Sequence, residues 1–232
     1  REKNIEVLLS KSLVVRNGIF QGMKYDLGES VGSSFLPKIL GSYEKELEKI
    51  LLKISQKNYN LIVDIGCAEG YYAIGFARLF KYKDTQIEAF DTDEKAQLLC
   101  RKNAKKNDVN IKVNDFCDSH RLLNLCKNKY ALIFIDAEGY EIELINEKLV
   151  RSLKSCDFLI EAHDFINIKT SEYLSNCFKK THKIQIIKSV DDISKAYEYK
   201  FPEIDNLSLK TKFQVLREDR PTIMRWIYAE KI

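Results

Sequence analysis

Short apolar runs alternate with longer amphipathic segments from residue 61 onward. The runs are rich in Ile, Leu, Val and Phe and cover residues 61–65, 87–90, 111–113, 131–135 and 158–160. Runs of this length and composition predict buried strands, and their alternation with segments of helical length is typical of an α/β fold with a parallel sheet. Two more strands are predicted near the carboxyl end, at 184–187 and 225–229, with a helix at about 207–216 between them.

Three other segments have the pattern expected of helices. In segment 93–106, Asp93 is a suitable N-cap, and one face carries Ala96, Leu99, Cys100 and Ala104. In segment 42–57, Ser42 is the predicted N-cap, and one stripe carries Leu47, Ile50, Leu51 and Ile54. The third segment, 69–80, directly follows the first predicted strand.

The first forty residues have a less regular pattern. Glycines separate short apolar pieces there, at Gly18, Gly22, Gly28, Gly32 and Gly41. Such spacing predicts turns and a small hairpin rather than a long helix. We expect residues 1–58 to form an amino-terminal extension with a capping helix, which covers a ligand site in the domain formed by residues 59–232.

An acidic residue lies at or just after the end of each of the first five predicted strands. These residues are Asp64, Asp91, Asp115, Asp136 and Glu161. In an open α/β sheet, ligands bind outside the carboxyl ends of the strands, so we expect the five acids to gather at one edge of the sheet.

The sequence Asp64-x-Gly66-x-Ala68-x-Gly70 connects the first strand to a helix. Glycine permits a tight turn there and lets a ligand approach the bare backbone. Asp91 lies at the end of the next strand, where a carboxylate can accept hydrogen bonds from both hydroxyls of a ribose. Together, the turn and Asp91 predict a nucleoside-containing ligand.

The spacing of the glycines separates two candidate cofactors. A dinucleotide-binding turn has the pattern G-x-G-x-x-G, which brings amide groups to a pyrophosphate, and this chain lacks it. S-adenosylmethionine has no phosphate, and its ammonium and sulfonium groups tolerate acids such as Asp64 and Glu69. Asp115 and Phe116 add an acceptor for the adenine amino group and an aromatic surface for its ring, although an ordinary strand-end turn explains them as well.

Several stretches of the chain resemble class I methyltransferases, and in particular the FkbM-type group, many members of which methylate hydroxyls of sugars, polysaccharides or polyketides. The stretches are Gly41-Ser-Tyr-Glu-Lys-Glu-Leu47, VDIGCAEGYY, EAFDTDEKA, Ile135-Asp-Ala-Glu-Gly-Tyr-Glu141 and Leu159-Ile-Glu-Ala-His-Asp164. The resemblance implies a Rossmann-like sheet of seven strands in the order 3-2-1-4-5-7-6, with strand seven antiparallel and helices on both faces. It also implies that residues 59–232 form the methyltransferase domain.

The resemblance and the motifs together predict the cofactor site. The amino-terminal segment with Tyr43 and Glu44 would fold over the cofactor, although a packed aromatic and a first-turn acid are an equally simple explanation of these two residues. The complete predicted set is Tyr43, Glu44, Asp64, Gly66, Cys67, Ala68, Glu69, Gly70, Tyr71, Asp91, Thr92, Asp115, Phe116 and Asp136.

Acids and a histidine after the fourth and fifth strands predict the chemistry. His163 is the candidate general base for an alcohol acceptor, because its ordinary pKa lies near working pH, and Asp136 and Asp164 are the candidate catalytic acids beside it. A divalent ion such as Mg²⁺ is the second possibility, with Asp136, Glu138, His163 and Asp164 as ligands. A capping or buried hydrogen-bonding pair is the structural alternative for His163 and Asp164.

Composition narrows the remaining choices. The net charge of +4 comes from lysines spread along the chain, so a nucleic-acid partner has no support. The six cysteines form no C-x-x-C pair, which predicts reduced core thiols. No long apolar run or secretory signal occurs, and we expect a cytoplasmic protein without a membrane span. The oligomeric state stays open.

These features favour O-methylation of a sugar, glycan or other hydroxylated small molecule. Two alternatives remain. One is an N-methyltransferase acting on RNA or protein, against which Asp136-Ala-Glu-Gly139 stands where amino-directed nucleic-acid enzymes have an Asn/Asp-Pro-Pro-Tyr/Phe loop. The other is a module that binds the cofactor or a partner protein without turnover.

Overall fold

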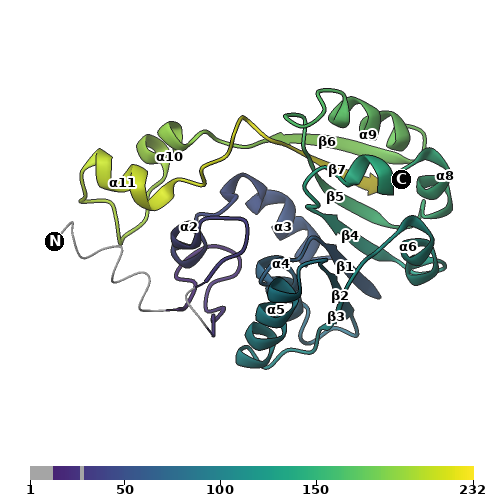
Figure 1. The fold of residues 1–232 in the computed structure, drawn as a ribbon, viewed down its shortest axis with the longest axis horizontal. Coiled ribbons are helices and arrows are strands. Elements are labelled where there is room, and N and C mark those ends of the chain that lie inside the picture. The colour runs from purple at the N-terminus through teal and green to yellow at the C-terminus, as the bar shows by residue number, and fades with distance from the viewer. Residues whose placement is uncertain (1–12, 27–28) are drawn as a thin grey trace.

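A computed structural model describes residues 13–26 and 29–232; Gly28, one of the predicted turn glycines, lies outside these ranges. Seven strands form a single sheet in the order β3-β2-β1-β4-β5-β7-β6 (Figure 1). Strands β1 to β5 pair in parallel, and β7 is antiparallel to both β5 and β6. The predicted strand order and the antiparallel seventh strand are therefore confirmed. The strands are β1 Leu61–Ile65, β2 Gln86–Phe90, β3 Lys112–Asn114, β4 Ala131–Ile135, β5 Asp157–Ala162, β6 His182–Lys188 and β7 Arg225–Lys231.

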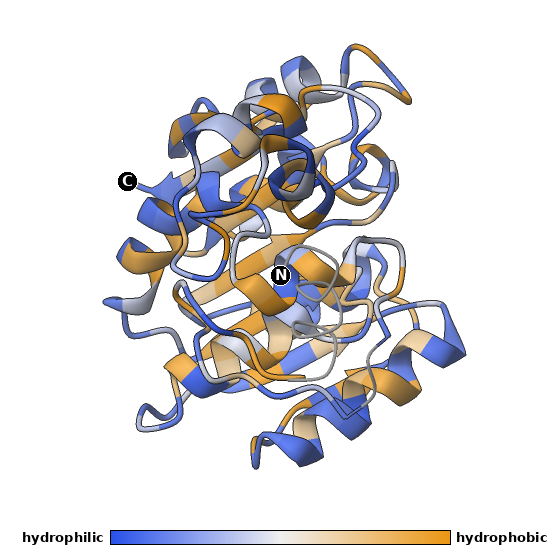
Figure 2. Ribbon diagram, turned by 90° about the vertical axis from the view of Figure 1, so that its left-hand side faces the viewer, coloured by the Kyte–Doolittle hydropathy of each residue, from blue (hydrophilic) through white to orange (hydrophobic). Residues whose placement is uncertain are grey.

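The central strands are the ones that the apolar runs predict most closely. Every residue of β1, β4 and β5 is buried, because helices cover both faces of a parallel sheet. In Figure 2 the middle of the sheet is correspondingly hydrophobic. In the edge strand β6 only the first residue, His182, is buried and the others are half-buried or exposed, and the structure extends the strand beyond the predicted run at both ends.

Helices connect the strands and cover both sides of the sheet. Asp93 caps α5 as predicted, since its Oδ1 accepts a hydrogen bond of 2.8 Å from the backbone N–H of Lys95. The helices are α2 Phe35–Leu40, the 3-10 helix η2 Lys45–Leu47, α3 Glu48–Ser55, α4 Tyr71–Leu79, α5 Glu94–Lys106, α6 Ser119–Cys126, α7 Glu141–Leu144, α8 Glu147–Ser152, α9 Thr170–Phe178, α10 Asp192–Glu198 and α11 Leu209–Leu216.

The predicted helix 42–57 is wrong at its amino end. Ser42 caps no helix: its hydroxyl donates to the carbonyl oxygen of Pro37 at 3.4 Å. Glu44 adopts a left-handed conformation with φ of 49°, and its N–H donates to Glu218 Oε1 at 3.0 Å. This contact spans 174 residues, so a distant carboxylate replaces the hydrogen bond that a continuous helix would make, and α3 begins only at Glu48.

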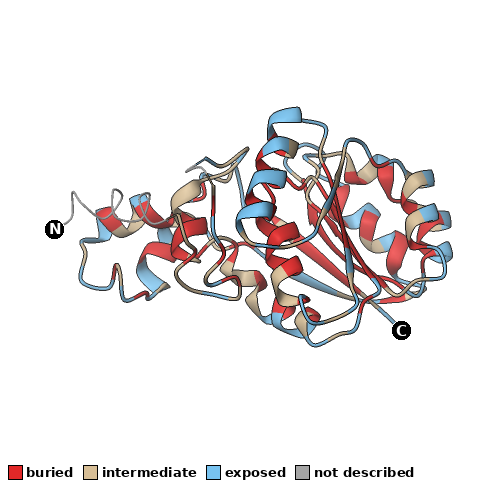
Figure 3. Ribbon diagram, turned by 90° about the horizontal axis from the view of Figure 1, so that it is seen from below, coloured by how far each residue is buried: buried red, intermediate tan, exposed pale blue. Residues whose placement is uncertain are grey.

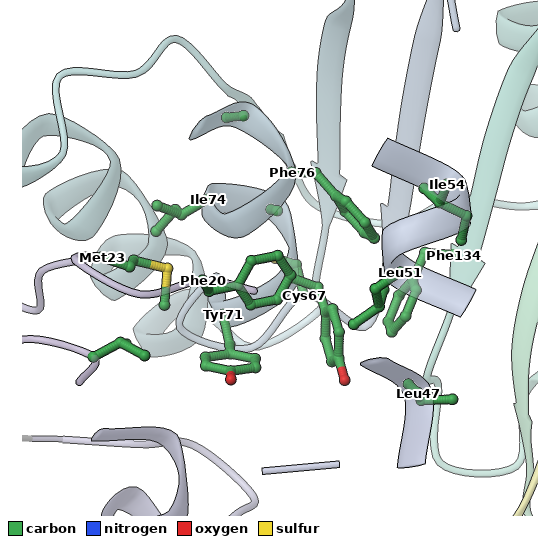
Figure 4. Close-up of a cluster of buried hydrophobic side chains, with 14 of the residues drawn as sticks. Phe20, Met23, Leu47, Leu51, Ile54, Cys67, Tyr71, Ile74, Phe76 and Phe134 are labelled. Carbon is green, nitrogen blue, oxygen red and sulfur yellow. The ribbon is translucent and has the colours of Figure 1, made fainter. Parts of the chain in front are cut away.

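Two hydrophobic cores lie on opposite sides of the sheet. One packs α3, α4 and the amino-terminal segment on the sheet, and Figure 4 shows Phe20, Leu51, Phe76 and Phe134 converging there. The other lies beneath α6, α8 and α9. In Figure 3 the helices turn buried faces toward the sheet and exposed faces outward. All six cysteines are free and buried, which confirms the prediction of reduced core thiols.

The amino-terminal segment has the predicted hairpin-like start. A bridge pairs Val14 with Lys24, and the Val15 N–H donates to the Met23 carbonyl oxygen at 2.8 Å. Phe20, at the turn, packs edge to face on Tyr71 and other aromatic rings of α4.

The segment around α2 lies beyond the carboxyl ends of the parallel strands. Figure 1 shows α10 and α11, which connect β6 to β7, beside α2 at this end of the molecule. No helix in the described ranges is long and apolar enough to cross a membrane. The segment around α2 and the connection that carries α10 and α11 therefore lie at the sheet edge where a ligand site is expected.

Candidate active site

A cavity of about 410 Å³ lies at the carboxyl ends of the parallel strands. All five strand-end acids predicted to gather at this edge line it, namely Asp64, Asp91, Asp115, Asp136 and Glu161. Residues 31–33 of the amino-terminal segment and residues 218–221 of the segment after α11 form other parts of the wall. The sheet edge thus supplies the acids, and the two covering segments enclose them.

The glycine turn after β1 passes very close to the end of β4. Gly66 has φ of +86°, and a Cβ added there would lie 1.7 Å from the carbonyl oxygen of Asp136. The N–H groups of Gly66 and Cys67 both donate to the Phe90 carbonyl oxygen, at 2.9 and 3.0 Å. The turn is therefore held between two neighbouring strand ends, and only glycine fits at its first position.

Asp91 is oriented by backbone donors on both sides. Its Oδ2 accepts from the Ala68 N–H at 2.8 Å, and its Oδ1 accepts from the Asp93 N–H at 2.9 Å. These bonds hold the carboxylate in the cavity wall beside Thr92, and each oxygen keeps further acceptor capacity. Asp91 can thus accept hydrogen bonds from a pair of adjacent hydroxyl groups.

Asp115 lies at the open end of the cavity. Its side chain is 77% exposed and pairs with Arg121 Nη1 at 2.8 Å. The hydrogen bond from Arg121 holds the pKa of Asp115 below its ordinary value. Phe116 follows it, and its ring centroid lies 5.3 Å from that of Tyr140. These two rings form an apolar surface at the mouth.

Asp64 is a buried acid without a hydrogen-bond partner of normal geometry in the described chain. Only 1% of the residue is exposed, and both of its carboxylate oxygens are buried. Burial raises the pKa of Asp64, and the charges of Asp136 and Asp91 raise it further, against a smaller lowering by the Ala73 backbone. One oxygen of Asp136 is similarly unpartnered. Because such groups are costly to bury alone, this part of the cavity is suited to a positively charged ligand group.

His163 presents one ring nitrogen to the cavity while the other is held from behind. Its Nδ1 lies 3.0 Å from Glu141 Oε1, which also accepts from the His163 backbone N–H at 2.9 Å. Its Nε2 lies 3.6 Å from Asp136, 3.6 Å from Glu138 and 3.7 Å from Glu161. With the proton on Nδ1, the Nε2 lone pair is directed into the cavity, as a general base requires.

His163 and Glu141, which are both buried, shift each other's pKa. Burial favours the neutral imidazole, but the hydrogen bond and charge of Glu141 outweigh it, and the pKa of His163 is raised. Burial alone would raise the pKa of Glu141, but the hydrogen bond to His163 lowers it overall. Glu141 belongs to a family-like stretch of the sequence, but its hydrogen bond to a residue 22 positions later leaves no local signal of this role.

Arg220 is a second residue that sequence analysis missed. Its guanidinium bonds to Glu44, Glu161 and, at 2.9 Å, Glu218. It therefore joins the amino-terminal segment, β5 and the segment after α11 across one wall of the cavity. Burial raises the pKa of Glu44 to about 7, although Arg220 opposes the rise. Because Glu161 and Glu44 lie 59 and 176 positions from Arg220, no sequence motif connects them to it.

Some predicted site residues do not line the cavity. Asp164 is directed to α9, where it accepts from the Ser171 N–H at 2.8 Å and pairs with Arg225 at 2.7 Å. Glu69 pairs with Lys38 and accepts from the Val31 N–H at 2.9 Å. Glu44 and Gly70 are likewise absent from the lining, whereas Tyr43, Asp64, Gly66, Cys67, Ala68, Tyr71, Asp91, Thr92, Asp115, Phe116, Asp136, Glu138 and His163 are all part of it.

A set of three side chains fits a divalent ion. Donor atoms of Asp136, Glu161 and His163 all lie within 4.8 Å of one another. Two carboxylates and an imidazole with room for ligand oxygens are a reasonable donor set for such an ion. The set differs from the predicted one because the hydrogen bond to α9 turns Asp164 away, and Glu161, the next-to-last residue of β5, lies near Asp136 and His163 instead.

A central part of the chain matches a known domain family. Residues 47–135 match the family model described as the methyltransferase small domain. This stretch runs from η2 to the end of β4 and contains the glycine turn, Asp91 and Asp115. A search of the curated proteins found no significant match.

Solved structures share the fold. A precorrin-6y C5,15-methyltransferase from Geobacter metallireducens is 16% identical with a TM-score of 0.52 over 78% of this chain and 85% of that one. The O-methyltransferase TomG from Streptomyces achromogenes, solved with SAM, is 11% identical with a TM-score of 0.51 over 82% and 80%. An rRNA methylase from Streptococcus thermophilus is 13% identical with a TM-score of 0.51 over 81% and 96%. At these low identities the three structures show a shared fold, and the domain match covers residues 47–135 alone.

Proposed function

We propose that this class I methyltransferase fold transfers the methyl group of S-adenosylmethionine to a hydroxyl of an uncharged or cationic small molecule, such as a sugar or glycan unit. The FkbM-type enzymes are the group that it resembles in sequence. The observation that carries the proposal is the His163–Glu141 pair, whose free Nε2 faces the same cavity as the glycine turn and Asp91.

The cofactor would lie along the ends of β1, β2 and β3. Asp91 would accept from the ribose hydroxyls, while Asp115 and Phe116 would lie beside the adenine. Asp64 and Asp136 would face the ammonium and sulfonium groups, which supply the positive charge that these partly unpartnered acids lack. A dinucleotide fits less well, because its pyrophosphate would meet the same acids.

Methyl transfer would then proceed by in-line displacement. The acceptor oxygen attacks the methyl carbon, the bond from carbon to sulfur breaks, and sulfur keeps the electron pair as a neutral thioether. His163 Nε2 takes the hydroxyl proton, and Glu141 stabilises the imidazolium that forms. Asp136 would help to position the acceptor, and Asp164 would contribute by fixing the chain after His163 to α9.

A metal-assisted variant of the same reaction is the second candidate. The mutual approach of Asp136, Glu161 and His163 favours it. A divalent ion bound there would acidify the acceptor hydroxyl. In that variant His163 would serve as a ligand, and Glu141 would orient the ring by the same hydrogen bond.

Asp91→Ala is expected to weaken the binding of S-adenosylhomocysteine by about 10- to 100-fold, because a ligand hydroxyl loses a charged acceptor. Isothermal titration calorimetry measures the change. Asp108→Ala is the matched control, since that carboxylate is exposed and pairs with Lys81 at the surface, away from the cavity. Both variants should unfold at similar temperatures. Undetectable binding to the unmodified protein would contradict the proposed function, and unchanged binding by Asp91→Ala would contradict the assigned ribose contact.

The acceptor class is tested with matched uncharged, amino and phosphorylated sugars and with RNA, by measuring the release of S-adenosylhomocysteine. We expect kcat/KM for the phosphorylated forms to be at least about 10-fold lower, because the described residues that line the cavity include eight acids and two lysine or arginine side chains. Preferred methylation of RNA or of phosphorylated sugars would contradict the proposed class. Turnover that survives excess chelator would remove the metal from the mechanism, whereas loss that Mg²⁺ restores would support it.

A further inference from the structure

Lys38 is a buried lysine in the wall of the cavity. It lies in the last turn of α2 and is only 3% exposed. Its ammonium group pairs with Glu69 and donates to the Ser30 hydroxyl at 3.0 Å. It also lies 4.9 Å from the ring centroid of Tyr43 and 5.5 Å from that of Tyr71. The reaction proposed above gives this residue no role.

Within residues 13–26 and 29–232, Lys38 and Arg220 are the only lysine and arginine that line the cavity. The Nε, Nη1 and Nη2 atoms of Arg220 each bond to a different carboxylate. A further anion near Arg220 would therefore meet an excess of negative charge. Lys38 has one carboxylate partner among the described residues. Two of the three N–H groups of its ammonium donate to Glu69 and Ser30. One donor remains for a ligand.

The position of Lys38 matches one end of the proposed cofactor. Glu69 belongs to the glycine turn, and Tyr71 is the first residue of α4. A cofactor that extends from Asp115 past Asp91 and along the turn places its amino-acid end here. The start of α4 has no side-chain cap, so its backbone adds a favourable field for a negative group.

We propose that Lys38 binds the carboxylate of the methionine moiety of S-adenosylmethionine. The inference rests on the proposed function and adds which residues bind each charged group of the cofactor. The acids Asp64 and Asp136 hold the ammonium and sulfonium side of the cofactor, and the lysine holds the carboxylate. Glu69 orients the lysine and, through Ser30 and the Val31 N–H, ties the covering segment to the same turn. Lys38 is thus a cofactor-binding residue, and its position depends on the packing of the amino-terminal segment against the glycine turn.

The test compares S-adenosylmethionine with its decarboxylated form, which lacks only the carboxylate. Calorimetry on the unmodified protein and on Lys38→Met gives four affinities. The preference is the ratio of the affinity for S-adenosylmethionine to the affinity for its decarboxylated form. We expect this ratio to be about 10- to 100-fold lower in Lys38→Met than in the unmodified protein, because a charge-assisted hydrogen bond is lost. The affinity for the decarboxylated form should stay within about twofold.

Three further variants separate ligand binding from folding. Lys38→Met/Glu69→Gln removes the carboxylate that the single variant leaves buried and unpaired, and it should show the same loss of preference. Lys38→Arg should keep part of the preference, and Lys49→Met, an exposed lysine on α3, should keep all of it. Equal weakening of both ligands in the single and double variants would show that Lys38 only anchors the segment. Failure of the unmodified protein to bind either ligand would overturn the proposed function instead.

Discussion

Replacement of His163 by glutamine is expected to lower kcat by about 10²- to 10⁴-fold, the usual contribution of a general base. Glutamine retains hydrogen-bonding groups near Glu141 but cannot take a proton from the acceptor. The Nε2 atom that would take it lies in the cavity wall, 3.6 Å from Asp136. Affinity for S-adenosylhomocysteine should change little, because the proposed cofactor contacts come from the ends of β1 to β4 and from Lys38 rather than from His163. Steady-state rates with saturating cofactor and acceptor measure the effect.

The control for this variant is His120→Gln, since His120 lies exposed on α6. The pH profile then identifies the group. A base works deprotonated, so kcat/KM should fall as the pH drops through the pKa of His163, which is raised above its ordinary value of about 6.5. Glu141→Gln removes the charge that raises this pKa, and the acidic limb should move to lower pH. Unchanged kcat in His163→Gln would rule out His163 as the general base. If the acidic limb of the pH profile does not move in Glu141→Gln, another group is responsible for it.

Substitution of Gly66 by alanine is expected to destabilise the fold by about 2–5 kcal/mol and to abolish cofactor binding. The left-handed conformation accounts for about 1–2 kcal/mol, and the forced shift of a packed neighbour accounts for about 1–3 kcal/mol. The new Cβ would lie 1.7 Å from the Asp136 carbonyl oxygen, which is backbone and moves only if the turn or the end of β4 moves. The same shift would displace Ala68 from Asp91. Urea unfolding and calorimetry measure the two effects.

Gly32→Ala is the matched control for this substitution. Gly32 also has a positive φ, of +68°, but no heavy atom lies within 4 Å of an added Cβ. This variant carries the conformational strain without the contact, and it should cost only about 1–2 kcal/mol. If Gly66→Ala were no less stable than Gly32→Ala, the close approach between the glycine turn and β4 would be incorrect.

The sequence by itself determined the strands, their acids and the glycine turn. Buried strands of a parallel sheet are continuous apolar runs, so β1 and β4 could be predicted to the residue. Acids at the ends of such runs lie at one edge of the sheet regardless of how the helices pack, and all five line the cavity. Gly66 and Asp91 were recognisable because the chemistry of a nucleoside site demands their residue types at that spacing.

The sequence was less informative where a residue's role depends on a distant partner. The helix predicted from Ser42 is interrupted because Glu44 binds Glu218, and Asp164 faces α9 because Arg225 pairs with it. In both segments the local pattern was sound. A contact formed only after folding overrode it, since one buried hydrogen bond to a charged group outweighs a small difference in helix propensity.

Only the tertiary structure decided which side chains surround the reacting end of the cavity. Lys38 and Arg220 lie in segments without a recognisable motif, and Glu141 lies in a family-like stretch that gives it no role of its own. Each acquires its position from partners between 22 and 176 residues away. Local sequence patterns record burial and backbone conformation, which are properties of neighbouring residues. The pairing of charges across a cavity is a property of the folded chain, because it depends on which segments the two hydrophobic cores bring together.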